Sequence, residues 1–173
     1  MSPLTWIDDL KLHLSYGTTG NSGIGNYAFY GLVGQGGNYN SQPSLSIAQP
    51  SNYDLTWETV KSFDVGVNFG FLNILSGEVN FDNKETVDML LTIPYSVAST
   101  GFSGATGNVG SMRNTGVDLN IQADIIKNRD WYWALRANFN YNHNEITKLY
   151  NGLDELAMPD YGLKYQVGHD AGE

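Results

Sequence analysis

The residues of this sequence best suited to recognising a ligand are aromatic rings and amides that gather in one long stretch. Between positions 17 and 57 they are Tyr27, Phe29, Tyr30, Asn38, Tyr39, Asn40 and Gln42. Aromatic rings stack on the apolar faces of sugars, and amides bond to sugar hydroxyls. We therefore predict that this stretch contacts a substrate or a partner protein, although glycine, asparagine and tyrosine are also ordinary loop residues.

The sequence gives only weak evidence for a cofactor site, a metal site or a catalytic site. The segment GIGNYA (Gly23 to Ala28) fits a dinucleotide fingerprint by its letters, but the strand before it and the helix after it are missing. The three histidines lack metal-ligand spacing, and His13 falls on the polar side of a strand pattern. Asp8 and Asp9 are adjacent, so their carboxylates diverge, whereas paired-carboxylate catalysis needs two groups that converge. We expect no catalysis, no metal and no cofactor.

Composition narrows the class of protein further. The net charge is -9 with only nine Lys and Arg, which argues against a nucleic-acid partner. The absence of cysteine excludes a disulfide scaffold and a thiolate metal site. No window holds about 18 consecutive apolar residues, so a protein of this sequence in a membrane would have to be a barrel. The first residues lack the pattern of a secretory signal, so we expect either a non-exported chain or a piece of a longer one.

Alternating side chains are the main structural signal. Ser62 to Phe71 reads SFDVGVNFGF, in which every second residue is Phe or Val, and successive side chains of a strand point to opposite faces. Together with four similar segments it predicts strands at 8–16, 58–72, 75–91, 113–127 and 130–150. The apolar phase of these strands carries no charge, which permits lipid contact, because a Lys or Arg facing the middle of a bilayer costs about 2–4 kcal/mol.

The connections between these strands alternate in length. Short turns follow the second and fourth strands, whereas long loops, at 17–57 and 92–112, follow the first and third. Outer-membrane barrels have short periplasmic turns and long outer loops. The pattern predicts an all-β chain of antiparallel up-and-down strands, a segment of a large outer-membrane β-barrel, with residues 1–173 forming one partial barrel.

Aromatic residues lie at the ends of the predicted strands, where a barrel has its girdles. They are Trp6, Trp131, Tyr132 and Trp133 beside the short turns, and Tyr53 and Trp57 at the opposite rim. A soluble secreted β-sandwich that binds carbohydrate would show the same alternation and is the alternative. The polar faces favour the barrel, because they contain few of the Lys and Glu residues that protect soluble sheet edges.

Longer motifs resemble one family. They are LKLHLSYGTTGN (Leu10 to Asn21), YDLTWE ending at Glu58, LSGEVNFDNKETVDMLL (Leu75 to Leu91), NVGSMRNTGVDLNI (Asn108 to Ile121), and the later WALRANFNYNHNEITKLY and YQVGHDAGE. In order and spacing they resemble the SusC/RagA family of TonB-dependent outer-membrane transporters of Bacteroidetes. Small departures occur at Asn80 to Asp82, where the family often has an acidic residue and paired aromatics, and at Asp118, where Glu is common.

The resemblance implies a function and a set of partners. Members import oligosaccharides, or in some cases peptides, through a barrel surrounded by outer-membrane lipid. A SusD-like surface lipoprotein caps that barrel, and TonB supplies energy through a plug domain that this sequence does not contain. The chain is therefore expected to be a slice from the middle to later part of a transporter barrel, with no enzymatic activity of its own.

Overall fold

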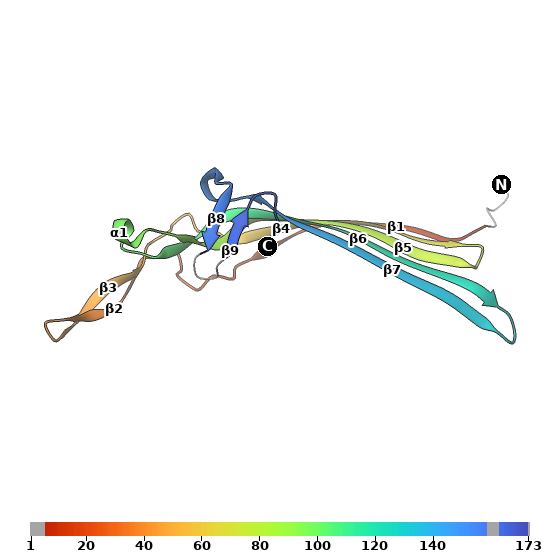
Figure 1. The fold of residues 1–173 in the computed structure, drawn as a ribbon, viewed down its shortest axis with the longest axis horizontal. Helices are drawn as coiled ribbons and strands as arrows, with labels where there is room; N and C mark the ends of the chain where they lie inside the picture. Colours follow the sequence, from red (N-terminus) through yellow and green to blue (C-terminus); the bar gives the residue numbers. More distant parts are fainter. Residues whose placement is uncertain (1–5, 159–162, 173) are drawn as a thin grey trace. The chain divides into compact units, whose positions relative to one another are not determined.

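The computed structural model describes residues 6–158 and 163–172, and these fold almost entirely as β-strands (Figure 1). The elements in order are β1 (Ile7–Asn21), β2 (Leu32–Tyr39), β3 (Gln42–Gln49), β4 (Glu58–Phe71), β5 (Leu75–Pro94), α1 (Val97–Thr100), β6 (Gly104–Lys127), β7 (Tyr132–Lys148), the 3-10 turn η1 (Tyr150–Gly152), β8 (Glu155–Met158) and β9 (Leu163–Gln166). Strands β1, β4, β5, β6 and β7 pair in this order in a five-stranded sheet, and β2–β3 and β8–β9 form two-stranded sheets. The prediction of an all-β chain is confirmed.

The residues divide into two compact units. The first, called the strand unit, takes its described residues from Met1–Thr18, Lys61–Glu85 and Arg113–Asn144. The second, called the loop unit, takes its described residues from Thr19–Val60, Thr86–Met112 and Glu145–Glu173. In the described part of the chain, no helix is long and apolar enough to cross a membrane.

Tight turns make neighbouring strands of the strand unit antiparallel. The β4–β5 turn contains Leu72 and Asn73, whose φ angles are 56° and 50°. Two successive positive φ values are typical of a type I′ turn, whose twist matches that of the flanking strands. The N–H group of Leu72 donates to the carbonyl of Trp6 (3.1 Å), and the Trp6 and Phe71 rings stack at 5.8 Å. The start of β1 is thereby attached to the β4–β5 hairpin.

The apolar face of the strand unit is open. Leu12 on β1 is 72% exposed and Phe139 on β7 is 58% exposed. In a β-sandwich these side chains would lie against a second sheet. All five strands of the strand unit instead belong to a single sheet, so the β-sandwich alternative does not describe this unit.

A small core lies in the loop unit. Ile146, Leu149 and Leu156 are buried together, and Tyr165 and Val167 pack against them. The N–H group of Ile146 donates to the carbonyl of His169 (2.9 Å), and that of Gly168 donates back to Ile146 (2.8 Å). The segment after β9 is therefore bonded to the end of β7.

The strands extend beyond the ranges that alternation predicts. β1 continues to Asn21 through Gly, Thr and Asn residues alone, and β6 begins at Gly104. The addition to β6 reads GATGNVGSM, in which Ala105, Val109 and Met112 do not alternate with polar residues in a regular apolar phase. The stretch 17–57 also contains the β2–β3 hairpin, and 92–112 contains α1. Alternation reports only strands with one apolar face, so strands that are polar or glycine-rich on both faces escape it.

Candidate functional site

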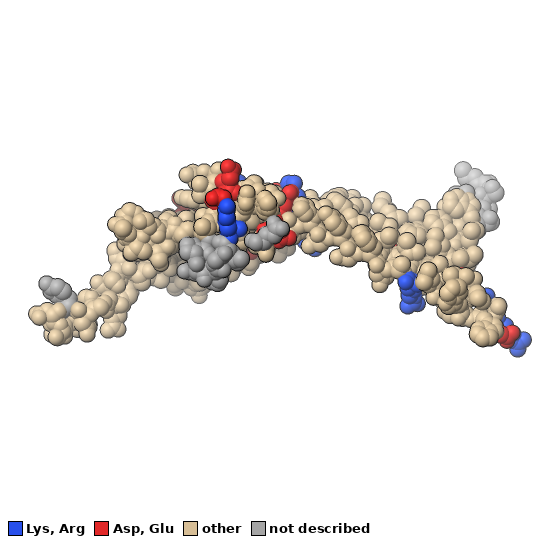
Figure 2. Space-filling model, viewed as in Figure 1, with Lys and Arg blue, Asp and Glu red and all other residues tan. Residues whose placement is uncertain are grey.

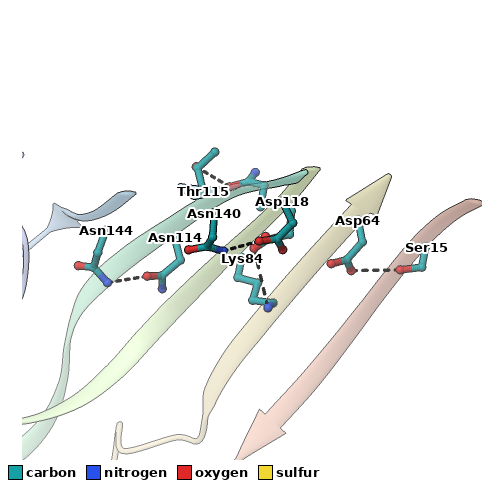
Figure 3. A network of polar contacts seen from close by, with 10 residues as sticks. Ser15, Asp64, Lys84, Asn114, Thr115, Asp118, Asn140 and Asn144 are labelled. Carbon is teal, nitrogen blue, oxygen red and sulfur yellow. Dashed lines mark hydrogen bonds and ion pairs between the residues drawn. The ribbon is translucent and has the colours of Figure 1, made fainter. Parts of the chain in front are cut away.

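The polar face of the strand unit is crossed by paired side chains (Figure 3). The amide of Asn144 on β7 donates to Asn114 on β6 (2.6 Å), and Asn140 donates to Asp118. One step further along, Arg136 Nε donates to the side-chain oxygen of Gln122 (2.8 Å). The three pairs share one antiparallel register, so Leu119 lies opposite Phe139 on the apolar face.

The same polar face links the other strands. Ser15 Oγ on β1 donates to Asp64 on β4 (3.1 Å), and Lys84 lies 3.8 Å from Asp82 within β5 (Figure 3). Amides, hydroxyls and carboxylates thus occupy the face opposite the apolar one. A single sheet with one polar face and one apolar face is typical of the wall of an outer-membrane barrel, which separates an aqueous interior from lipid.

On this polar face, a glycine leaves space that two neighbouring side chains fill. Gly66 lies between His13 on β1 and Asn80 on β5, and both side chains occupy the space that a β-carbon on Gly66 would need. Among the described residues, the side-chain oxygen of Asn80 is buried and lacks a hydrogen-bond partner, whereas its nitrogen donates to Glu78 (2.7 Å). The adjoining cavity has a volume of about 250 Å³ and includes Asp64 among its lining residues. Asp82, Asp118 and Lys84 also line this cavity, so it presents several carboxylate acceptors and one ammonium donor.

A second cavity, of about 550 Å³, lies nearer the short turns. Its polar lining comprises Asp9, Asn68, Ser76, Glu78, Asn120, Gln122, Arg136 and Asn138. The lining combines two carboxylates and one guanidinium with neutral amides, so it can form hydrogen bonds with both donor and acceptor groups of a ligand. Its residues come from all five strands of the sheet, so it forms only when the whole register is correct.

The structure brings three of the predicted loop residues together. Phe29 and Tyr30 have ring centroids 4.1 Å apart, and Tyr27 stacks on Tyr30 at 6.2 Å. Tyr53 joins them with ring centroids 6.4 Å from Phe29 and 6.5 Å from Tyr30. These four rings, called the aromatic cluster, remain accessible, and Tyr27 and Tyr53 are 67% and 74% exposed.

The other predicted loop residues form a separate group at the tip of the β2–β3 hairpin. Asn38 pairs with Pro43 and Tyr39 with Gln42, while Asn40 has a φ of 49° in the turn. The side chain of Tyr39 is outside the described part of the structure. Because β2 rises about 3.3 Å per residue, the tip lies roughly 20 Å along the hairpin from its base. The seven residues therefore fall into two groups, one in the aromatic cluster and one at the hairpin tip.

Sequence reasoning missed the residues that hold the aromatic cluster in place. Gln49 donates from its side chain to the carbonyls of Ala28 and Tyr30, and the N–H group of Asn52 donates to Phe29 (2.9 Å). The sequence pattern places Tyr53 in a membrane girdle, because this residue precedes a strand. In the sequence, the only sign that Asn52 and Tyr53 both belong to the aromatic cluster is that they are adjacent in the segment PSNYDLTWE.

Asn108 is a second residue whose role depends on tertiary contacts. The N–H group of Thr56 donates to its side-chain oxygen (2.9 Å), and its nitrogen donates to the carbonyls of Thr56 (2.9 Å) and Asp88 (2.7 Å). Asn52 similarly donates to the carbonyl of Thr106 (3.1 Å). These amides attach the segment that follows the aromatic cluster to β5 and β6 within the loop unit.

Two of the weaker sequence candidates, the dinucleotide-like segment and the histidines and carboxylates, can be located in the structure. A strand does precede Gly23 to Ala28, because β1 ends at Asn21, so the expectation that no strand precedes this segment is wrong. The segment itself consists of bends and turns, and the next element is strand β2 instead of the helix that a dinucleotide site needs. Within 6–158 and 163–172, no group of three or more His, Asp or Glu side chains could hold a metal ion.

The geometry first defines a class of protein: a sheet of antiparallel strands with one apolar face and one polar face, in which short turns and long connections alternate along the chain. Residues 4–167 match the model of the TonB dependent receptor-like β-barrel family. This chain belongs to that family, and the family places it in the outer membrane.

Individual relatives agree with this assignment. The chain is 33% identical to TonB-dependent receptor SusC of Bacteroides thetaiotaomicron, covering 95% of this chain and 17% of that protein. It is 36% identical to TonB-dependent receptor P39 of Formosa agariphila, covering 99% and 16%. The solved structure of the RagAB peptide transporter matches with a TM-score of 0.79 and 44% identity over 97% of this chain and 19% of that chain. The resemblance to SusC/RagA proteins is confirmed, and the chain spans less than a fifth of each relative.

Proposed function

We propose that this chain forms part of the wall and outer loops of a TonB-dependent importer of the SusC/RagA type. The observation that carries the proposal is its 44% identity, at a TM-score of 0.79, to the RagAB peptide transporter. In this role the apolar face contacts outer-membrane lipid and the polar face lines the aqueous interior. The chain supports transport, not catalysis.

The substrate class in this proposal is a peptide or an oligosaccharide, with peptide favoured. A second similar structure, the RagAB peptide importer in a closed-closed state, is 45% identical and covers 95% of this chain. Paired amides and carboxylates on the polar face provide the acceptors and donors that a peptide backbone requires. The aromatic cluster provides a platform that would suit either substrate.

The partners in this proposal are a SusD-like surface lipoprotein and TonB. The lipoprotein would meet the outer loops, and TonB would act through a plug domain that lies outside this chain. The predicted contact residues, Tyr27, Phe29, Tyr30, Asn38, Tyr39, Asn40 and Gln42, belong to those loops.

Transport by the full-length protein in its outer membrane tests this function. We expect uptake of labelled peptides of several residues that stops when TonB is deleted, and peptides that co-purify with the transporter in mass spectrometry. TonB-dependent uptake of oligosaccharides alone would move the substrate to the second class. Uptake that persists without TonB would contradict the proposed mechanism.

A further inference from the structure

Three charged side chains lie together on one face of the strand unit. On the side of the molecule that Figure 2 shows, the surface over the strands is mostly tan, so Lys, Arg, Asp and Glu are few there. Arg113 on β6 lies 3.8 Å from Glu85 on β5, measured from guanidinium nitrogen to carboxylate oxygen. Lys61 on β4 is as far from the β4–β5 turn as Glu85 is on β5, so these two residues lie opposite each other. The three residues are called the charged row.

The charged row has the same phase as the apolar side chains of the sheet. On β4, Lys61 alternates in step with Phe63 and Val65, and on β6, Arg113 alternates in step with Val117. Every second side chain of a strand points to the same side. The charged row therefore lies on the face that the apolar residues occupy, opposite the face of the polar pairs in Figure 3.

Successive rows across β4, β5 and β6 change from apolar to charged. They are Val65–Phe81–Val117, then Phe63–Asn83–Thr115, then the charged row. The middle row already contains polar groups, and Thr115 Oγ1 donates to the side-chain oxygen of Asn83 (3.5 Å). A charge that faces lipid costs most free energy at the middle of the bilayer and little near its surface. The charged row therefore marks the level at which the apolar band ends and the lipid headgroups begin.

The charged row lies toward the end of the sheet from which the long connections leave. Lys61 is near the start of β4, which follows the long stretch 17–57, whereas the short β4–β5 turn lies at the other end of that strand. Outer-membrane barrels place their long loops outside the cell and their short turns in the periplasm. The headgroups at the level of the charged row are therefore those of the outer leaflet.

The position of the charged row within the sheet limits what can cover it. Strands β4, β5 and β6 are the three central strands of the sheet, and β1 and β7 are its edges. Further strands of a barrel pair with the edges, and whatever fills a barrel lies against its polar face. Neither reaches the outward side of the central strands, where the row adjoins the surface of the outer membrane.

The charged row has the chemistry of a phosphate site. Within the described ranges, the exposed ammonium of Lys61 has no ion-pair partner. Two cations and one carboxylate leave the row with one net positive charge. Strands β4 and β6 are two strand spacings apart, roughly 10 Å, which the long side chains of Lys and Arg can span to reach one group. Lys and Arg are also the side chains that bind phosphate.

We propose that Lys61 and Arg113 bind the phosphate group of an outer-leaflet lipid, whose acyl chains lie against the apolar rows beside them. Glu85 orients the Arg113 guanidinium and also limits the strength of binding, because its carboxylate repels the phosphate. A lipid held there fixes the level of this part of the barrel in the membrane. The proposal rests on the outer-membrane placement of the family and not on transport.

Removing the two cations tests the proposal. Short-chain phosphatidic acid, a lipid with a phosphate monoester, is titrated into the purified full-length transporter in a neutral detergent, and native mass spectrometry measures the bound lipid. We expect Lys61→Gln to lower the affinity about fivefold, and Lys61→Gln together with Arg113→Gln about thirtyfold. Lys84→Gln removes the same charge from the opposite face of β5 and should change the affinity by less than about twofold. An equal loss in the Lys84→Gln variant, or no loss in the double variant, would overturn the proposal.

The substitution Glu85→Gln separates lipid binding from a structural role of the ion pair. We expect this change to raise the affinity for phosphatidic acid about fivefold, because it removes one charge that repels the phosphate. A row that only held β5 and β6 together would bind no more lipid after the change. Unchanged or weaker binding by the Glu85→Gln variant would therefore overturn the proposal.

Inorganic phosphate distinguishes a lipid from a free anion as the ligand. We expect inorganic phosphate at the same concentration to leave the bound phosphatidic acid in place, because the acyl chains contribute to binding through the apolar rows. Displacement of the lipid at equal concentration would show that free phosphate is the ligand and would overturn the lipid proposal.

The lipid proposal and the proposed function fail in different ways. If the unaltered transporter does not bind phosphatidic acid, the lipid proposal is overturned, while TonB-dependent peptide uptake still supports the proposed function. If uptake is absent but the lipid binds through the charged row, the lipid proposal stands and the transport function fails.

Discussion

At the scale of single residues, Gly66 shows how a missing side chain organises the polar wall. His13 and Asn80 reach into the space above it from the two neighbouring strands. The buried oxygen of Asn80 needs a donor, because a polar atom without one costs free energy.

Gly66→Ala is expected to destabilise the barrel by about 1–3 kcal/mol, because the new methyl group overlaps with both neighbouring side chains. The measurement is the denaturant midpoint of the full-length protein in detergent. Gly17→Ala on β1 is the matched control, since a β-carbon there meets no atom within 4 Å. Adding His13→Ala to Gly66→Ala should recover part of the loss, and no recovery would contradict the overlap.

At the scale of the elements, the strands carry the division between lipid and water. Phe69 illustrates how closely the apolar face is packed: its ring covers Gly77 on the adjacent strand, where a β-carbon would lie 2.6 Å from the ring. An aromatic ring over a glycine compensates for the missing side chain. The two faces of β6 show the division most simply, because Leu119 and Asn120 are adjacent and point to opposite sides.

Leu119→Lys is expected to cost about 2–4 kcal/mol of stability in the membrane, because the ammonium would face lipid. Asn120→Lys places the same group on the polar face and should cost less than about 1 kcal/mol. The comparison is the yield of heat-modifiable, folded protein in outer-membrane fractions. Similar yields for the two variants would show that Leu119 does not face lipid.

At the scale of the whole molecule, the chain is an incomplete structure. Its five-stranded sheet ends at β1 and β7, and its apolar face is exposed. Unpaired edges invite association between chains, and a barrel avoids them by closing. The chain spans less than a fifth of the length of the relatives that it matches.

The isolated chain of 173 residues is expected to aggregate in detergent-free buffer, because both sheet edges and the apolar face are uncovered. Size-exclusion chromatography with and without detergent provides the measurement. A monomeric chain with a cooperative melting transition in plain buffer would contradict the barrel assignment at this scale.

Local patterns were sufficient for the class of fold. The alternation in SFDVGVNFGF requires only that successive side chains of a strand point to opposite sides, which is a local property of the backbone. The short turns and long loops are likewise read along the chain. These features predicted an antiparallel sheet with one apolar and one polar face. The family match and the similarity to the RagAB structure confirmed the family. Runs such as Gly104 to Asn108 escaped prediction, since no apolar phase marks them as strand.

Only the tertiary structure decided which residues meet. His13, Gly66 and Asn80 come together through the register of three strands, and a shift of one residue would place each on the opposite face. Tyr53 joins the aromatic cluster, whereas Asn38 and Gln42 belong to a hairpin tip. The sequence by itself determined the character of each strand face, because that depends on neighbours along the chain. The sites required the structure, because their members are distant in sequence and meet only through strand pairing and loop packing.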